Sequence, residues 1–225
     1  MLLLLTVLYI GFVDIGCKYN NNHQVQLFEN PYKSIGEEHN KLLQEMFDNN
    51  EDMSDINAYL KYAGNTSRNN NDFVALVELI INQDFQDFEE NWEVIFSNLS
   101  EHVAEIVKPE IVLTVNTILS SNDDNQITSI CEELVNEYTT NHPKTVTACG
   151  SIATYFSSKE FWLSTGISED ELLGFVIADL LGAAAGAGAS YLGDYLDGDE
   201  YGHGDAISQG LMVGLAVSGL YYAVH

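Results

Sequence analysis

The stretch Gly174–Ser190 reads GFVIADLLGAAAGAGAS and decides the fold of the C-terminal quarter of the chain. Its small residues recur at every fourth position, and a second series with this spacing follows a short acidic segment. Residues four apart share one helix face, and small side chains there let two backbones approach closely. Glycine costs a helix about 1 kcal/mol relative to alanine, so this many glycines require a packing reason. We predict a glycine-zipper helical hairpin over residues 167–225, with arms that pack through Gly174, Ala178, Gly182, Gly186 and Ser190 and through Ala206, Gly210, Gly214 and Ser218.

Two locations are open for this hairpin. Each arm is close to the ~20 residues needed to cross a bilayer, and paired small residues are typical of membrane helices. Against a membrane location, Asp179 lies inside the first arm, where an unpaired carboxylate costs a few kcal/mol in lipid. In addition, no Lys or Arg follows Lys159, so no basic residues flank the arms. The alternative is a hairpin packed against the rest of the protein or against a second copy of it.

Residues 32–166 are predicted to form a helical domain, so the expected class is all-α, a helical domain followed by the hairpin. Ser34, Ser157 and Ser168 are each followed three residues later by Glu, the pattern of a capping box at a helix start. A further helix is expected near Val103–Leu119, with Pro109 at its start or at a kink. Apolar stripes at helical spacing separate Asn-rich breaks. The stripes comprise Ile35, Leu42, Leu43, Met46 and Phe47, then Phe73, Leu76, Val77, Ile80 and Ile81, then Trp92, Ile95, Phe96 and Leu99.

The first 17 residues indicate export. Met1–Val13 is an uncharged apolar run, and a Gly-Cys pair follows it at residues 16 and 17. This pattern fits a bacterial lipoprotein signal, with Cys17 as the lipidated residue, although no basic residue precedes the run and Asp14 departs from the pattern. A plain secretory signal and a buried N-terminal helix are the alternatives. Residues 18–31 are polar and are predicted to be a tether between the anchor and the folded body.

Cys131 and Cys149 remain once Cys17 is assigned to a lipid. Each lies nine residues from Thr140, within two predicted helices joined by a turn at residues 140–143. An antiparallel helix pair would place both cysteines at similar heights, and an exported protein meets oxidising conditions. The sequence therefore suggests a Cys131–Cys149 disulfide, with two free core cysteines as the alternative.

The composition excludes some partners. The chain has 225 residues, with 34 acidic against 8 basic and a formal net charge of -26. Its 46% hydrophobic content is too high for a disordered chain. Nucleic-acid binding requires clusters of Lys and Arg that eight scattered cations do not supply. The acidity should instead attract cationic partners or divalent ions.

No catalytic motif is recognisable. The six histidines lack metal-ligand spacing, and no phosphate-binding loop or nucleophile elbow occurs, so we expect neither an enzyme nor a cofactor. The acidic segment between the two glycine series is a weak candidate for a calcium site, because carboxylates among glycines can wrap a hard cation. Its spacing does not match an EF-hand, and a solvated turn is the alternative. The candidate ligands are Asp194, Asp197, Asp199, Glu200 and Asp205.

Residues 30–43 read NPYKSIGEEHNKLL. This segment resembles a group of uncharacterised bacterial envelope lipoproteins, which carry an Asn-Pro-Tyr, an aliphatic-Gly pair and a His-Asn pair soon after the signal. Many of them end in a Gly/Ala-rich helical tail. The resemblance implies location and architecture, and no activity. His39 and Asn40 are expected to fix how this helix docks, with a ligand or partner site as the alternative.

Together these observations predict an exported, lipid-anchored helical envelope protein with a structural or interaction role. It would contact the membrane through the anchor or through the hairpin, and its small-residue faces allow self-association. The competing hypothesis is a membrane-active effector or pore former whose hairpin inserts into a target bilayer.

Overall fold

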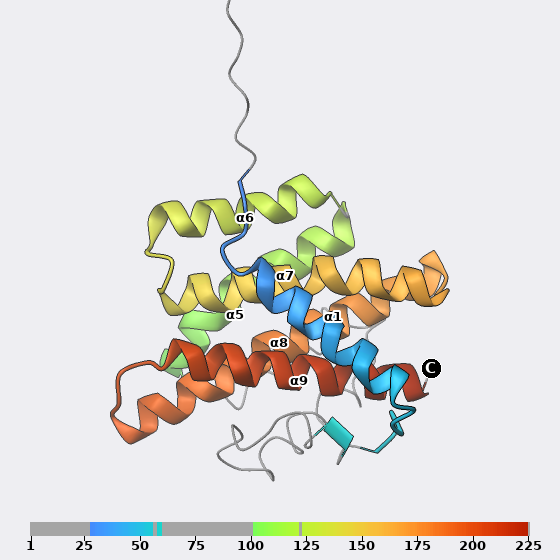
Figure 1. Ribbon diagram of the computed structural model, residues 1–225. Coiled ribbons are helices and arrows are strands. Elements are labelled where there is room, and N and C mark those ends of the chain that lie inside the picture. Colours follow the sequence, from blue (N-terminus) through green and yellow to red (C-terminus); the bar gives the residue numbers. More distant parts are fainter. Residues whose placement is uncertain (1–27, 56–57, 60–100, 122, 225) are drawn as a thin grey trace, which may run out of the picture.

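A computed structural model describes residues 28–55, 58–59, 101–121 and 123–224 (Figure 1). These residues form helices and no strand, which confirms the predicted all-α class for this part of the chain. Cys17 and the apolar stripes that begin at Phe73 and Trp92 lie outside the described residues. The helices are α1 (Lys33–Asp48), α5 (Glu101–Ser120), α6 (Asp124–Glu137), α7 (Pro143–Thr165), α8 (Glu169–Asp197) and α9 (His203–Val224).

The C-terminal helices α8 and α9 form the predicted hairpin. α8 ends at Asp197, and the C-cap residue Gly198 has a left-handed φ of 74°, a conformation that favours glycine. The two glycine series face each other across the helix pair. A Cβ atom added to Gly182 would lie 2.8 Å from the Cα of Gly214, and one added to Gly186 would lie 2.5 Å from the carbonyl oxygen of Gln209. The backbones are therefore in contact, as the small-residue spacing predicted.

The hairpin shares one hydrophobic core with the helices that precede it. Beyond α9, helix α8 packs against α7 and α5, so its central residues from Phe175 to Gly188 are all buried. Both Glu171–Asp197 and His203–Ala223 are long and apolar enough to cross a membrane, by length and composition alone. Their most apolar windows are 83% and 67% buried inside this fold, as expected for core helices.

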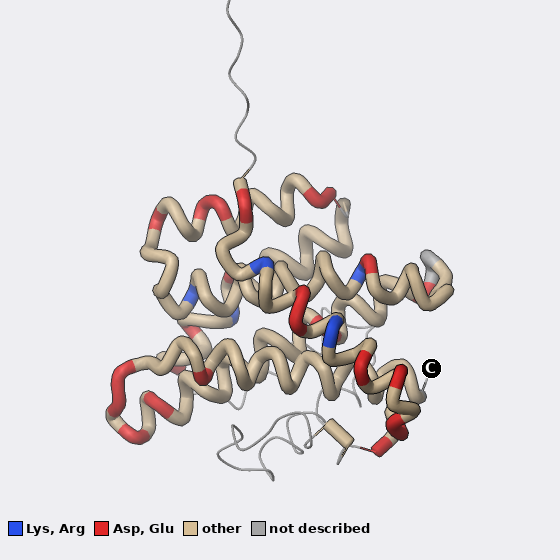
Figure 2. The backbone as a smooth tube through the Cα atoms, viewed as in Figure 1, with Lys and Arg blue, Asp and Glu red and all other residues tan. Residues whose placement is uncertain are grey.

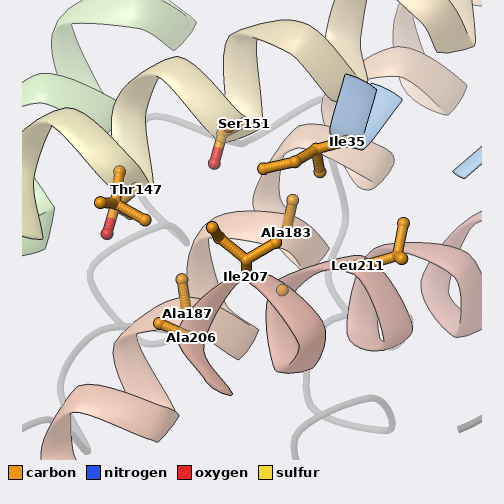
Figure 3. A pocket seen from close by; sticks show the side chains of 11 residues that line it. Ile35, Thr147, Ser151, Ala183, Ala187, Ala206, Ile207 and Leu211 are labelled. Carbon is orange, nitrogen blue, oxygen red and sulfur yellow. The ribbon is translucent and has the colours of Figure 1, made fainter. Parts of the chain in front are cut away.

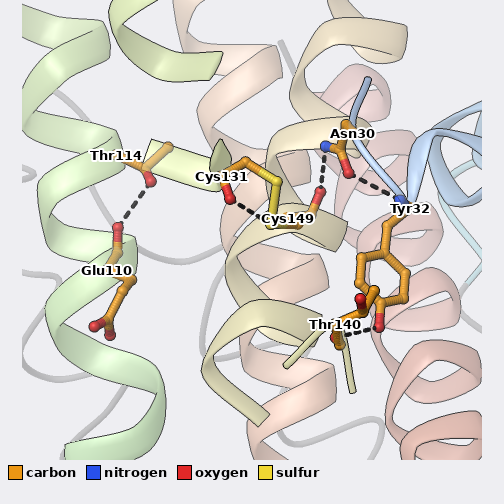
Figure 4. Close-up of a disulfide and its surroundings, with 7 residues drawn as sticks. All are labelled: Asn30, Tyr32, Glu110, Thr114, Cys131, Thr140 and Cys149. Atoms are coloured by element: carbon orange, nitrogen blue, oxygen red, sulfur yellow. Dashed lines mark hydrogen bonds between the residues drawn. A yellow bond between two sulfur atoms is a disulfide. The ribbon is translucent and has the colours of Figure 1, made fainter. Parts of the chain in front are cut away.

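Helix α1 lies across α7 and α9 (Figure 1). Helix α6 packs on the other side of α7, where a disulfide joins Cys131 to Cys149 with their Cα atoms 5.2 Å apart (Figure 4). Lys159 on α7 adds an ion pair with Asp124 on α6, at 3.0 Å. Helix α7 therefore lies at the centre of the fold, where it packs against α1, α6 and both helices of the hairpin.

The observed helix starts correct two of the three capping-box expectations. Ser34 does not cap α1, because the Asn30–Tyr32 turn already begins the helix at Lys33. Ser157 lies in the interior of α7, because this helix continues without a break from Pro143 to Thr165. The N-cap of α7 is His142, followed by a proline whose fixed φ suits the first helical position. Ser168 does lie at the N-cap of α8, where its hydroxyl donates to the Glu171 carboxylate at 2.7 Å.

Pro109 lies inside α5, which begins eight residues earlier at Glu101. The proline therefore does not start this helix. Acidic positions gather at the turn between α8 and α9 and just after α1, while basic positions are few (Figure 2).

Candidate functional site: a buried carboxyl where four helices meet

Asp179 lies in the middle of α8 and is fully buried. Its Oδ2 accepts a hydrogen bond from the Ser158 hydroxyl and another from Trp162 Nε1, the latter at 3.0 Å. Ser158 and Trp162 are four residues apart on α7, so they project from one helix face toward the carboxyl. Ser218 of α9 approaches the same carboxyl without a well-formed hydrogen bond. Asp179, in the middle of the first helix of the apolar hairpin, therefore lies against α7.

The environment of Asp179 disfavours its charge. Burial raises the pKa of this carboxyl, because a low-dielectric interior destabilises the ionised form. The positive charge that His39 can carry, the hydrogen bonds from Ser158 and Trp162, and the nearby Ser218 hydroxyl act in the opposite direction and lower the pKa. Burial is the larger effect, so the pKa of Asp179 is raised overall.

His39 of α1 is the fourth contributor, and it too is fully buried. Its Nδ1 lies 3.3 Å from Asn40 Oδ1. Asn40 Nδ2 donates to the carbonyl oxygen of Ser157, which turns the Asn40 Oδ1 toward the imidazole as an acceptor. The hydrogen of the imidazole therefore belongs on Nδ1. His39 Nε2 and Asp179 Oδ1 have no hydrogen-bond partner among the described residues.

This arrangement differs from a catalytic Ser-His-Asp set. In such a set the histidine stands between the two other residues, accepting from the serine and donating to the carboxylate. Here Ser158 donates directly to Asp179, and His39 bonds to neither of them. All three side chains are fully buried. The hydrogen bonds to Asp179 join α7 to α8, and His39 of α1 and Ser218 of α9 complete the surroundings of the carboxyl.

The Asn-Pro-Tyr segment docks the start of α1 onto α7 and its preceding turn (Figure 4). Asn30 Nδ2 donates to the carbonyl oxygen of Cys149 at 2.8 Å, and Asn30 Oδ1 accepts from the backbone of Tyr32. The Tyr32 hydroxyl donates to the carbonyl oxygen of Thr140 at 2.8 Å. The bonds to Cys149 and Thr140 each join residues more than 100 positions apart in the sequence, so the segment fixes tertiary structure.

The remaining residues of the pattern continue this contact. A Cβ atom on Gly36 would meet the carbonyl oxygen of Ala153 and Ser157 Oγ, so α1 and α7 approach closely here. Asn40 binds the carbonyl oxygen of Ser157, one turn further along both helices. His39 lies between these contacts and faces the core, as the docking interpretation expects.

A small cavity lies between α7, the hairpin and α1 (Figure 3). Thr147 and Ser151 reach it from α7, opposite Ala183, Ala187 and Ala206. The hydroxyls of Thr147 and Ser151 have no hydrogen-bond partner among the described residues. The cavity measures about 10 Å³, close to the room that one water molecule needs.

The acidic segment between α8 and α9 does not gather into a metal site. Asp194 is buried, and its Oδ2 accepts from the backbone of Gly202 at 2.8 Å, closing the turn. The other four candidates, Asp197, Asp199, Glu200 and Asp205, are exposed. No group of three or more His, Cys, Asp or Glu side chains suited to a metal ion occurs within the described residues. The segment is a closed, acidic turn.

Sequence reasoning identified His39 and Asn40 but missed Ser158 and Trp162. These two residues lie on a helix more than 100 residues further along, and their register with α1 exists only in the fold. Asp179 offered a usable signal, because a single carboxylate inside a long apolar arm requires partners. Comparison with known proteins adds no assignment: no protein-family model, no curated protein and no solved structure matches this chain.

Proposed function

We propose that the chain is an exported helical protein of a bacterial envelope, held by a lipid on Cys17, with a structural or interaction role. The observation that carries this proposal is the use of the Asn30–Asn40 pattern. Asn30 and Asn40 bind carbonyl oxygens of α7, and Tyr32 binds the carbonyl oxygen of Thr140 in the turn before α7. These contacts fix the segment onto α7 and the turn before it. Such a fixed starting point, placed after a polar tether, suits a protein that is displayed from a lipid anchor.

The surface supports binding of a cationic partner. The net charge is -26, and the turn between α8 and α9 concentrates acidic residues (Figure 2). Beside them, Tyr195 is 47% exposed and Leu196 is 72% exposed. Apolar side chains within a field of one sign favour partners that combine positive charge with apolar contact.

Metabolic labelling with a palmitate analogue tests the anchor. The wild-type chain and a Cys17→Ser variant would be expressed in a bacterium that exports lipoproteins, and membrane and soluble fractions would be compared. We expect label and membrane association in the wild type, and the loss of both in Cys17→Ser. A Cys131→Ser, Cys149→Ser variant is the matched control and should keep the label. An unlabelled wild type would refute the anchor.

A membrane-active role remains the second candidate, because α8 and α9 are both long and apolar enough to span a bilayer. Insertion would require α8 to leave α7, and Asp179 would then lose its bonds to Ser158 and Trp162. Dye release from anionic liposomes distinguishes the two functions. We expect no release at micromolar protein, and rapid release would favour the effector over the displayed protein.

A further inference from the structure

Helix α7 directs two buried hydroxyls toward the hairpin. Thr147 and Ser151 are four residues apart, so their side chains project from one face of α7. Each residue is 2% exposed, and neither hydroxyl has a hydrogen-bond partner among the described residues. Both side chains line the small cavity between α7, α1 and the hairpin (Figure 3). A buried hydroxyl without a partner destabilises a fold, so two of them in one cavity require an explanation.

Another buried threonine of α7 shows how such a hydroxyl is usually satisfied. Thr154 is 1% exposed, and its Oγ1 donates to the carbonyl oxygen of Gly150 on its own helix, at 3.1 Å. Thr147 and Ser151 make no such bond, and their hydroxyls remain available to the cavity. The two hydroxyls at the cavity therefore differ from an otherwise similar group on the same helix.

The size and the lining of the cavity define what can occupy it. Its volume of about 10 Å³ is close to the space that one water molecule needs. Apart from the two hydroxyls, the lining is aliphatic or glycine, as at Ile35, Ala183 and Gly210. No charged side chain of the described residues lines the cavity, so an ion would lose its hydration there without compensation. Because a hydroxyl both donates and accepts, the occupant should be a small neutral molecule that does the same.

We propose that this cavity is a binding site for one water molecule, which bridges Thr147 Oγ1 and Ser151 Oγ where α7 meets the hairpin and α1. Buried waters make two to four hydrogen bonds, and the two hydroxyls supply the first two. The alanines opposite, Ala183, Ala187 and Ala206, have no polar side-chain atom to offer these hydroxyls. The water therefore completes the contact between α7 and the small-residue faces of the hairpin.

A crystal structure of the full chain, at a resolution that shows ordered water, tests the site directly. We expect a water oxygen about 2.5–3.0 Å from both hydroxyl oxygens, the range of O–H···O hydrogen bonds. An empty cavity would overturn the proposal, whether or not the hydroxyls have turned to the carbonyl oxygens of Pro143 and Thr147 on their own helix. A water that contacts only one of the two hydroxyls would also overturn it.

Urea unfolding of a Thr147→Val variant gives an independent measurement. Valine keeps the shape of the side chain and removes the hydroxyl, so the bound water would lose a partner. We expect the urea midpoint to fall. Removal of a buried hydroxyl that has no partner at all should leave the midpoint unchanged or raise it, and either result would contradict the proposal.

A double variant tests whether the two hydroxyls share one water. Ser151→Ala should also lower the midpoint, and the two changes together should lower it by clearly less than the sum, because each removes the same water. Thr154→Val is the matched control, since its hydroxyl bonds to its own helix and does not line the cavity. Its effect should add to that of Thr147→Val. Additive effects of Thr147→Val and Ser151→Ala would contradict a shared water.

Discussion

At Gly36, α1 comes so close to α7 that no side chain fits between them. An added Cβ atom would meet the backbone carbonyl of Ala153 and lie 2.5 Å from Ser157 Oγ. The carbonyl belongs to a helix backbone, so it cannot move aside as a flexible side chain could. The glycine is required by proximity, and its own conformation is helical.

We therefore expect Gly36→Ala to lower the free energy of unfolding by about 1–3 kcal/mol, the usual cost of overpacking. Gly204→Ala is the matched control, because a Cβ atom there would have nothing within 4 Å. On α9 that change should be neutral or stabilising by up to ~1 kcal/mol, as alanine favours helix. Urea denaturation of both variants measures the difference. Equal effects would show that α1 does not pack as described.

Some residues of the candidate site could be predicted from the sequence, and others could not. His39 and Asn40 stood out because they sit in a short pattern near the start of the body. Asp179 stood out as a carboxylate in an apolar arm. Ser158 and Trp162 have ordinary helical surroundings in the sequence, and only the packing of α7 on α8 gives them a shared target. A contact between two helices cannot be recognised from the residues that surround either partner in the sequence.

At the scale of helices, the hairpin depends on contact between backbones. Gly182→Ala should destabilise the protein by about 1–3 kcal/mol, because its Cβ atom would lie 2.8 Å from the Cα of Gly214. Gly182→Leu should be worse. Ala189→Leu changes an exposed position on the same helix and should alter stability by no more than about 0.5 kcal/mol. Thermal unfolding compares the three variants, and an unchanged melting temperature in Gly182→Leu would contradict close packing.

The periodic small residues predicted the close-packed hairpin, whereas the capping-box pattern predicted only one of three helix starts. Ser168 marks the start of α8, but Ser157 has the same pattern and lies inside α7. A capping box describes only the first turn of a helix. Whether a helix begins there depends on the preceding residues, and before Ser157 nothing breaks the helix.

The disulfide between α6 and α7 is a second feature that holds helices together. Cys131 and Cys149 close a loop of 18 residues between α6 and α7. A crosslink over a loop of this length restricts the unfolded chain and stabilises by about 3 kcal/mol. We expect the Cys131→Ala, Cys149→Ala variant to lose roughly this amount in urea unfolding. A thiol reductant should destabilise the wild type and leave the double variant unchanged, and a wild type indifferent to the reductant would rule out the bond.

For the whole molecule, charge is the dominant feature. A net charge of -26 in 225 residues means that carboxylates repel one another over much of the surface. Salt screens such repulsion, because the Debye length falls from ~30 Å at 0.01 M to ~3 Å at 1 M. The folded state, being compact, benefits more from screening than the unfolded chain does.

Sodium chloride should therefore raise the melting temperature, by about 2–4 °C for each kcal/mol of repulsion relieved in a chain of this size. Potassium chloride at the same ionic strength should give the same rise, because general screening does not distinguish the two cations. A scan from low to high salt checks this. A melting temperature that falls with salt would mean that local ion pairs such as Lys144–Glu110 outweigh the overall repulsion.

The position of the last basic residue has a practical consequence for proteolysis. Lys159 lies within α7, is paired with Asp124, and is followed by 66 residues without Lys or Arg. Trypsin has no cleavage site in α8 or α9, and its last site is protected while α7 stays helical. Limited digestion of the native protein should spare the hairpin. Complete digestion after denaturation should release both helices as a single large peptide, which is the fragment to seek in mass spectrometry.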